Sequence, residues 1–135
     1  MAVPFEVEEL DHVVLRCHDQ DRMLDFYVRI LGLTEERRLE AIGLIQLRAG
    51  RSLVDLVPDA GGAPREHPNV DHLCLAIATP DLDVVVRYLV TSGVETIGEP
   101  MVRYGARGYG PSIYCRDPEG NVVELKGSSE MPPGT

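Results

Sequence analysis

Apolar residues follow two periods along the chain, and the same succession of periods occurs twice. Residues 10–17 and 70–78 alternate between apolar and other side chains, as half-buried strands do. After each segment, apolar residues recur at spacings of three and four positions, which predicts an amphipathic helix with one apolar stripe. The stripes comprise Leu24, Tyr27, Val28 and Leu31 in the first helix, and Leu82, Val85, Val86 and Leu89 in the second. The pattern therefore predicts two units with the same order of elements.

The chain divides into two modules joined by a linker. We predict a leader at residues 1–9, a first module at 10–57, a linker at 58–69, a second module at 70–127 and a disordered tail at 128–135. The linker is rich in proline and glycine and has no apolar period, as connecting segments do. Each module reads as a strand, a helix and three strands. The predicted fold class is therefore α+β, with two tandem βαβββ modules and a mostly antiparallel sheet.

A hairpin is predicted near the end of each module. It joins residues 43–48 to 52–57 in the first module, and residues 112–116 to 121–126 in the second. The second hairpin turns through Asp-Pro-Glu-Gly, which is strong turn chemistry. Residues 101–111 are rich in glycine and proline, so we predict a loop there that acts as a flexible flap.

Composition and charge exclude several classes of function. The net charge of -9 argues against a nucleic-acid partner, because phosphate contacts need clustered lysine and arginine. No apolar run approaches the length of a membrane span, and the N-terminus does not resemble an export signal, so we expect a cytoplasmic protein. The three cysteines, Cys17, Cys74 and Cys115, form no C-x-x-C pair and are expected to be small buried thiols in strands.

Strand alternation places two histidines on one kind of face. If the apolar positions of residues 10–17 and 70–78 pack under the helices, His12 and His72 must point to the opposite face. Glu124 takes the same opposite face in the last strand of the second module. Asp55 occupies the corresponding place in the first module, although apolar residues on both sides leave its direction open.

These four side chains have the chemistry of a metal site. Two imidazoles and two carboxylates suit a divalent first-row metal such as Zn, Ni, Fe, Co or Mn, and ligand type alone does not choose among them. Further polar residues face the same way if the apolar positions of their strands pack under the helices. These residues are Arg16, Arg48, Tyr114 and Lys126. They would suit a small anionic substrate, or they would solvate a sheet edge.

Several motifs resemble the vicinal oxygen chelate superfamily, which comprises glyoxalases, bleomycin-resistance proteins and dioxygenases. The motifs are Leu10-Asp11-His12-Val13, Asp25-Phe26-Tyr27 with Ile30-Leu31-Gly32-Leu33, Val70-Asp71-His72-Leu73, and Arg116-Asp117-Pro118-Glu119-Gly120-Asn121-Val122-Val123-Glu124-Leu125. The resemblance implies a glyoxalase-like fold, in which paired βαβββ modules curve into a cup around a metal. It also implies a homodimer. Whether one chain supplies both modules of a cup, or chains exchange modules across the dimer, stays open.

The resemblance also implies ligands and a reaction. Members with the glyoxalase arrangement place ligands where His12, Asp55, His72 and Glu124 stand here, although Asp55 departs from the commoner Glu or Gln. Three-ligand members would use the two histidines and Glu124. The implied activity is that of a lyase or isomerase acting on a substrate with adjacent oxygens through a metal-stabilised enediolate-type anion. Glu124, with Asp55 as its partner, would move the proton.

Two other classes of function are consistent with the same resemblance. One is a different metal enzyme, either an extradiol dioxygenase or a thiol transferase that modifies an antibiotic. Asp55 as a fourth ligand argues against the dioxygenase, which needs two histidines, one carboxylate and open positions. The other is a metal-free, drug-binding protein of the bleomycin-resistance kind. Such proteins characteristically lack the ligands, whereas all four candidates are retained here.

Overall fold

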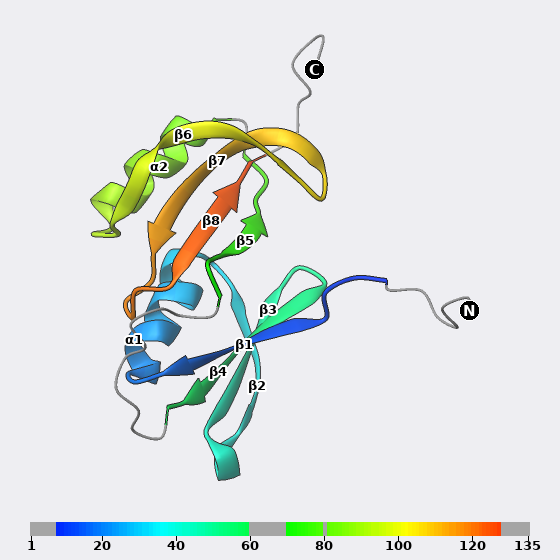
Figure 1. Cartoon of the computed structure of the whole chain (residues 1–135). Coiled ribbons are helices and arrows are strands. Elements are labelled where there is room, and N and C mark those ends of the chain that lie inside the picture. The colour runs from blue at the N-terminus through cyan, green and yellow to red at the C-terminus, as the bar shows by residue number, and fades with distance from the viewer. Residues whose placement is uncertain (1–7, 60–69, 80, 128–135) are drawn as a thin grey trace, which may run out of the picture. The chain divides into compact units, whose positions relative to one another are not determined.

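The computed structural model describes residues 8–59, 70–79 and 81–127. The chain forms two compact units, Met1–Gly61 and Gly62–Thr135. Most of the predicted leader and linker, and the predicted tail, lie outside the described residues. Each unit contains one four-stranded sheet and its own helical segment (Figure 1).

The first unit has the predicted strand–helix–three-strand order. Its elements are β1 (His12–Cys17), α1 (Gln20–Leu24), η1 (Asp25–Ile30), β2 (Thr34–Leu39), η2 (Glu40–Ile42), β3 (Leu44–Ala49) and β4 (Ser52–Pro58). The sheet order is β1-β4-β3-β2, with β1 parallel to β4 and the other pairs antiparallel. Asp19 caps α1, because its side chain accepts a hydrogen bond from the backbone N–H of Arg22 at 3.1 Å.

The buried stripe of the first helical segment differs from the prediction. Met23, Phe26 and Tyr27 are buried, whereas Leu24 and Val28 are only partly covered. The buried residues still follow the helical spacing i, i+3, i+4, so the prediction chose a stripe displaced around the helix from the one that is buried. α1 continues directly into η1, which is a π-helix.

The second unit repeats the topology of the first. Its elements are β5 (Leu73–Ala76), α2 (Leu82–Thr91), β6 (Thr96–Gly105), β7 (Gly108–Arg116) and β8 (Val122–Lys126). The order β5-β8-β7-β6, with β5 parallel to β8, matches that of the first sheet. Leu82 and Leu89 of the predicted α2 stripe are buried. The predicted α+β fold with two βαβββ modules is therefore confirmed.

The predicted loop at residues 101–111 was wrong, because these residues belong to the β6–β7 hairpin. Figure 1 shows this hairpin as a long, curved ribbon. Gly105 and Gly108 pair at its end and leave two residues for the turn. Tyr104 and Tyr109 pair across the strands, with ring centroids 5.0 Å apart. Such cross-strand aromatic pairs stabilise strands that contain several glycines, which is why glycine content alone misled the prediction.

The sheets have one apolar and one polar face, as alternation predicted. In the first unit the apolar face contains Leu15, Cys17, Ile45, Leu47, Val54 and Leu56, all buried. In the second it contains Ile113, Cys115, Val123 and Leu125, also buried. Cys74 contradicts the prediction of three buried thiols, because it lies on the polar face of β5 and is exposed. None of the helices in the described ranges has the length and apolar character needed to cross a membrane.

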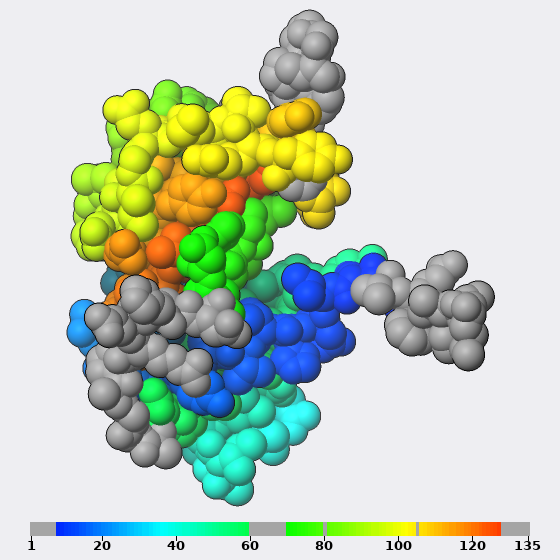
Figure 2. All heavy atoms as spheres, viewed as in Figure 1, coloured from blue at the N-terminus to red at the C-terminus, as the bar shows by residue number. Residues whose placement is uncertain are grey.

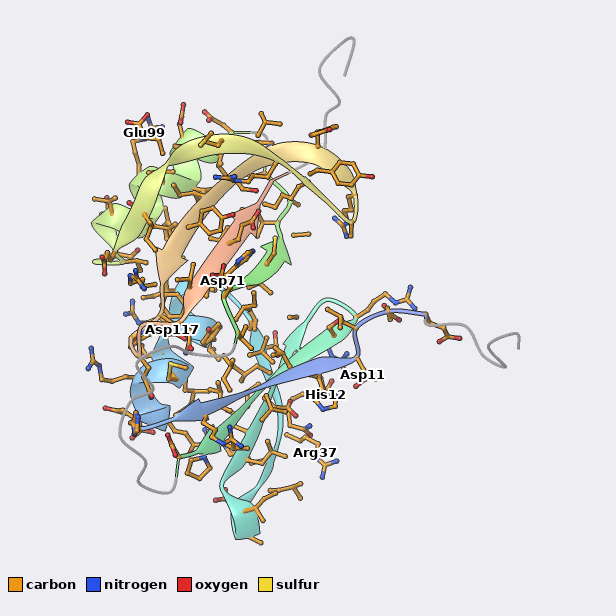
Figure 3. The ribbon with its side chains drawn as sticks, viewed as in Figure 1. Asp11, His12, Arg37, Asp71, Glu99 and Asp117 are labelled. Atoms are coloured by element: carbon orange, nitrogen blue, oxygen red, sulfur yellow. The ribbon has the colours of Figure 1, made fainter. Side chains whose placement is uncertain are left out.

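The β7–β8 turn provides a test of how the second unit is held together. The buried Asp117 carboxylate accepts hydrogen bonds from the backbone N–H of Glu119 and of Asn121 at 2.9 Å, and from the Asn121 side-chain amide at 2.7 Å (Figure 3). We expect Asp117→Ala to lower the free energy of unfolding by about 2 kcal/mol, because three donors lose their acceptor. Urea denaturation measures the change. Asp117→Asn retains one acceptor oxygen and should lose less, and equal losses in the two variants would contradict this account.

Candidate functional site

Each of the two predicted histidine ligands lies beside an aspartate that precedes it in the sequence. Nδ1 of His12 lies 2.8 Å from Oδ1 of Asp11, and Nδ1 of His72 lies 2.7 Å from Oδ2 of Asp71 (Figure 3). A carboxylate can only accept, so the Nδ1 atom of each histidine carries the proton of this hydrogen bond. The hydrogen bond with Asp11 raises the pKa of His12, and the charge of Asp55 adds to this effect. Metal binding through Nε2 requires the neutral imidazole with its proton on Nδ1, and the neighbouring aspartates favour that arrangement.

Asp55 projects from β4 onto the polar face of the first sheet and is 4 % exposed. Its Oδ2 accepts a hydrogen bond from Nε2 of Gln46 at 3.1 Å, because Gln46 is its neighbour on β3. Its Oδ1 is buried and has no hydrogen-bond partner among the described residues. A buried carboxylate oxygen without a partner is costly in a folded protein. A metal ion is one partner that would satisfy it, so this carboxylate fits the predicted ligand role.

Glu124 projects from β8 onto the polar face of the second sheet and is 6 % exposed. Its Oε1 lies 3.2 Å from Nε2 of His72, which immediately precedes β5. Two atoms that ligate one metal at about 2.1 Å each are roughly this far apart when the ligand–metal–ligand angle is near 100°. The predicted His72–Glu124 pair is therefore brought together with a spacing that fits a shared metal.

Two neighbours of Glu124 are affected by its charge. Tyr114 and Cys74 are its partners on β7 and β5, and the charge of its carboxylate acts on both side chains. Desolvation, followed by the charge of Glu124, raises the pKa of the Tyr114 phenol, and it raises the pKa of the Cys74 thiol to about 11. In Figure 2 the green atoms of β5 lie at the surface beside the orange-red atoms of β8. The Cys74 thiol therefore stays protonated near neutral pH and is a poor nucleophile.

The internal repeat shows that Gln46 and Tyr114 are equivalent. The row Val14–Asp55–Gln46 in the first sheet corresponds to the row Cys74–Glu124–Tyr114 in the second. In the first row Gln46 donates a hydrogen bond to the candidate ligand carboxylate, and in the second Tyr114 lies beside it, close enough for the charge of Glu124 to raise the pKa of the phenol. Sequence reasoning missed Gln46. The predicted turn pairs residue 48 with residue 52 and would have placed Ile45 opposite Asp55, whereas in the structure Ala49 pairs with Ser52 and Gln46 takes that place.

The predicted substrate-binding residues lie in different environments. Arg48 makes an ion pair with Glu36, with 2.6 Å between Nη2 and Oε2, so its charge is already balanced. Arg16 is exposed on β1, whereas Lys126 is buried on β8. Tyr114 contacts the His72 ring edge-on, with 5.4 Å between centroids. Sequence reasoning also missed Arg103, whose guanidinium lies 5.4 Å from the Tyr114 ring centroid, because the predicted loop hid its place on β6.

The structure thus associates His12 with Asp55 in the first unit, and His72 with Glu124 in the second. Within the described residues no group of three or more histidine, cysteine, aspartate or glutamate side chains lies close enough to hold a metal ion. Each unit therefore provides two candidate ligands, one imidazole and one carboxylate.

A double substitution tests whether the Asp55 carboxylate is kept for a ligand. We expect Gln46→Leu to lower the free energy of unfolding of the metal-free protein by about 1–3 kcal/mol, because it leaves both oxygens of a buried carboxylate unpartnered. The double variant with Gln46→Leu and Asp55→Leu should regain most of this loss, because an apolar pair leaves no group unsatisfied. Urea denaturation measures both. A double variant less stable than Gln46→Leu would show that the carboxylate stabilises the fold instead.

The reactivity of Cys74 tests the electrostatics around Glu124. In metal-free protein, alkylation of Cys74 by iodoacetamide should reach half its maximal rate near pH 11, well above the ordinary thiol value of about 8.5. Glu124→Gln should move this midpoint down, because a neutral amide no longer opposes the thiolate. Mass spectrometry distinguishes Cys74 from the buried Cys17 and Cys115. A midpoint near 8.5 in the unsubstituted protein would contradict the assigned environment.

Comparison with known proteins gives relatives over nearly the whole chain. A virulence protein of Salmonella typhimurium is 31% identical over 129 residues, covering 92% of this chain and 87% of that protein. Its crystal structure matches with a TM-score of 0.73 at 25% identity, covering 93% of this chain and 100% of that one. A glyoxalase domain-containing protein of Mycosarcoma maydis is 33% identical over 124 residues, covering 88% of this chain and 68% of that protein.

A solved structure and a family model identify the fold and the family of the chain. The crystal structure of a glyoxalase/dioxygenase from Nostoc punctiforme matches with a TM-score of 0.77 at 19% identity, covering 96% of this chain and 97% of that one. This likeness shows that the fold is glyoxalase-like. The family model for the Glyoxalase/Bleomycin resistance protein/Dioxygenase superfamily matches residues 9–125. Together with the repeated βαβββ topology, this match shows that the chain belongs to the glyoxalase/bleomycin resistance/dioxygenase superfamily.

Proposed function

We propose that the protein is a metal-dependent lyase or isomerase of the glyoxalase kind, acting on a small substrate with two adjacent oxygens. The observation that carries the proposal is the duplicated pair of one imidazole and one carboxylate on the polar face of each sheet. Many members of the superfamily are enzymes, and many depend on a metal. A metal-free binding protein would have no evident need for two such pairs, each with one buried acidic member.

In this proposal the ligands are His12, Asp55, His72 and Glu124. Each chain binds one divalent ion, whose identity among Zn, Ni, Fe, Co and Mn is set by availability as well as by affinity. When bound, the ion supplies Lewis-acid stabilisation of the negative charge that develops on the substrate oxygens. Asp11 and Asp71 hold the imidazoles with Nε2 directed away from their own carboxylates.

The chain's own residues move the proton. Glu124 is the general base that removes a proton from the substrate carbon, and His72, whose Nε2 lies 3.2 Å from Oε1, orients its carboxylate. Asp55 is its acid–base partner and is oriented by Gln46. A homodimer is the expected assembly. The substrate is a small molecule that carries an anionic group.

Metal content and turnover test the proposal together. We expect the purified protein, reconstituted with a divalent metal, to hold one ion per chain by elemental analysis and to convert the adduct of methylglyoxal and a thiol. His12→Ala and His72→Ala should each weaken metal binding by more than the 10–100-fold that is typical when an outer partner of a ligand is lost. His18→Ala is the matched control, because His18 pairs with Asp59 outside the candidate ligand set and should leave metal content and turnover unchanged.

The other outcomes identify the competing functions. Absence of metal from the unsubstituted protein and from His72→Ala alike would contradict the proposal in favour of a metal-free drug-binding protein. Bound iron with oxygen consumption on a catechol would favour an extradiol dioxygenase. Thiol addition to an antibiotic, without turnover of the methylglyoxal adduct, would favour an antibiotic-modifying transferase.

A further inference from the structure

A second buried polar atom lacks a partner, and it lies in the second unit. Ser112 on β7 is 1 % exposed, and its Oγ has no hydrogen-bond partner among the described residues. Ser112 alternates with the buried Ile113 and lies on the same face of β7 as Tyr114. Its hydroxyl therefore belongs to the polar face, two residues along the strand from the neighbour of Glu124. Buried hydroxyls without partners are rare and call for a physical explanation.

The side chain of Arg103 extends along the same face of the hairpin. Arg103 is the partner of Gly110 across the β6–β7 hairpin, and its guanidinium lies 5.4 Å from the ring centroid of Tyr114. On β7, Ser112 lies between Gly110 and Tyr114 on that face. The register therefore places the arginine side chain, which extends from Gly110 toward the ring, in the neighbourhood of Ser112. Nη2 of Arg103 also lies 3.7 Å from Sδ of Met101, which is the partner of Ser112 on β6. Gly110 permits this path because it has no side chain in the way.

A second cation lies on the other side of the same hydroxyl. Lys126 on β8 is the partner of Ser112 across the β7–β8 pair and is 6 % exposed. Partners in a sheet point to the same face, with β-carbons about 5 Å apart. Its charge acts on the nearby Cys74 thiol, which places the ammonium on the polar face. Ser112 is thus flanked by two positively charged side chains from two different strands.

The charges around Ser112 favour an anionic ligand. Among residues 8–59, 70–79 and 81–127, no carboxylate makes an ion pair with Arg103, and its contacts are the Tyr114 ring and the Met101 thioether. Glu124, on the same face, pairs with His72 at 3.2 Å and has Tyr114 and Cys74 as its strand neighbours. A hydroxyl donor with an arginine and a lysine beside it matches an oxyanion, since charge-assisted hydrogen bonds from such donors are the strong ones.

We propose that Arg103, Ser112 and Lys126 form an anion-binding subsite that receives an oxyanion group of the substrate, either a carboxylate or a phosphate-type group. The inference rests on the proposed function, because it names the charged group of the substrate that the proposed enzyme would bind. Tyr114 separates the subsite from the His72–Glu124 pair, so the oxyanion and the reacting carbon of the substrate occupy neighbouring positions along β7. Arg103 and Ser112 are therefore specificity-determining residues, whereas Glu124 acts on the reacting carbon.

Binding of simple anions to the full chain tests the subsite directly. Isothermal calorimetry and thermal unfolding are followed with inorganic phosphate and, in a parallel arm, with acetate, at constant ionic strength. The protein is studied both after treatment with a chelator and after metal reconstitution. A ligand that binds the folded state alone raises the unfolding temperature in proportion to its affinity. We expect saturable binding of at least one anion, and the stronger of the two arms identifies the group as phosphate-type or carboxylate.

Two variants separate a ligand site from a structural role. Arg103→Gln should weaken anion binding about tenfold, because a charged donor is lost, whereas Arg87→Gln on α2 is the matched control and should bind as the unsubstituted protein does. Ser112→Ala should weaken binding about fivefold and yet leave the anion-free protein equally or more stable, because an unpartnered buried hydroxyl is removed. This combination is not expected of a residue that serves the fold alone.

Other results would overturn the subsite or separate it from the proposed function. Equal anion binding by Arg103→Gln and Arg87→Gln would overturn the subsite. A less stable anion-free Ser112→Ala would also overturn it, because the hydroxyl would then be satisfied within the protein or by a bound water. Anion binding that persists in a chain unable to hold metal would retain the subsite while the proposed metal-dependent reaction fails. Metal binding and turnover without any binding of phosphate or acetate would retain the proposed reaction and overturn the subsite.

Discussion

Both units depend on an inner strand that pairs with a parallel neighbour on one side and an antiparallel neighbour on the other. In the first unit this strand is β4, between β1 and β3, and in the second it is β8, between β5 and β7. Pairing on both sides fixes the register completely, and a slip of one residue would turn every side chain to the other face. The strict register allows Asp55 and Glu124 to be buried on the polar face while Val54 and Val123 fill the core.

A buried carboxylate has a cost, and the two units offset it differently. Glu124 has His72, Tyr114 and Cys74 around it, so both its charge and its hydrogen-bonding capacity are shared. Asp55 has Gln46 on one oxygen and no partner among the described residues on the other. Half-satisfied polar groups of this kind are retained in proteins where a ligand completes them. The repeat has thus kept the position of the carboxylate while its surroundings have diverged.

The same divergence explains why the second unit has the stronger candidate for substrate recognition. The row that holds Val14 and Gln46 in the first unit holds Cys74 and Tyr114 in the second. Tyr114 provides a ring that Arg103 can cover, and the long β6–β7 hairpin provides the strand from which Arg103 reaches it. In the first unit Arg48, which corresponds to Arg116 in the second, pairs with Glu36. Both units have therefore kept an imidazole and a carboxylate, and the second has cationic groups beside them.

The sequence by itself determined the two βαβββ modules, the order of elements along each of them and the face on which His12, His72 and Glu124 were expected to lie. Alternation and helical periods are local, and the chain repeats them, so they can be read without coordinates. Tertiary structure decided the features that depend on distant pairing. It turned residues 101–111 into a hairpin, selected Met23, Phe26 and Tyr27 as the buried side of the first helical segment, exposed Cys74 and placed Gln46 and Arg103. These features follow from cross-strand register and side-chain packing, which residues far apart in the sequence establish together.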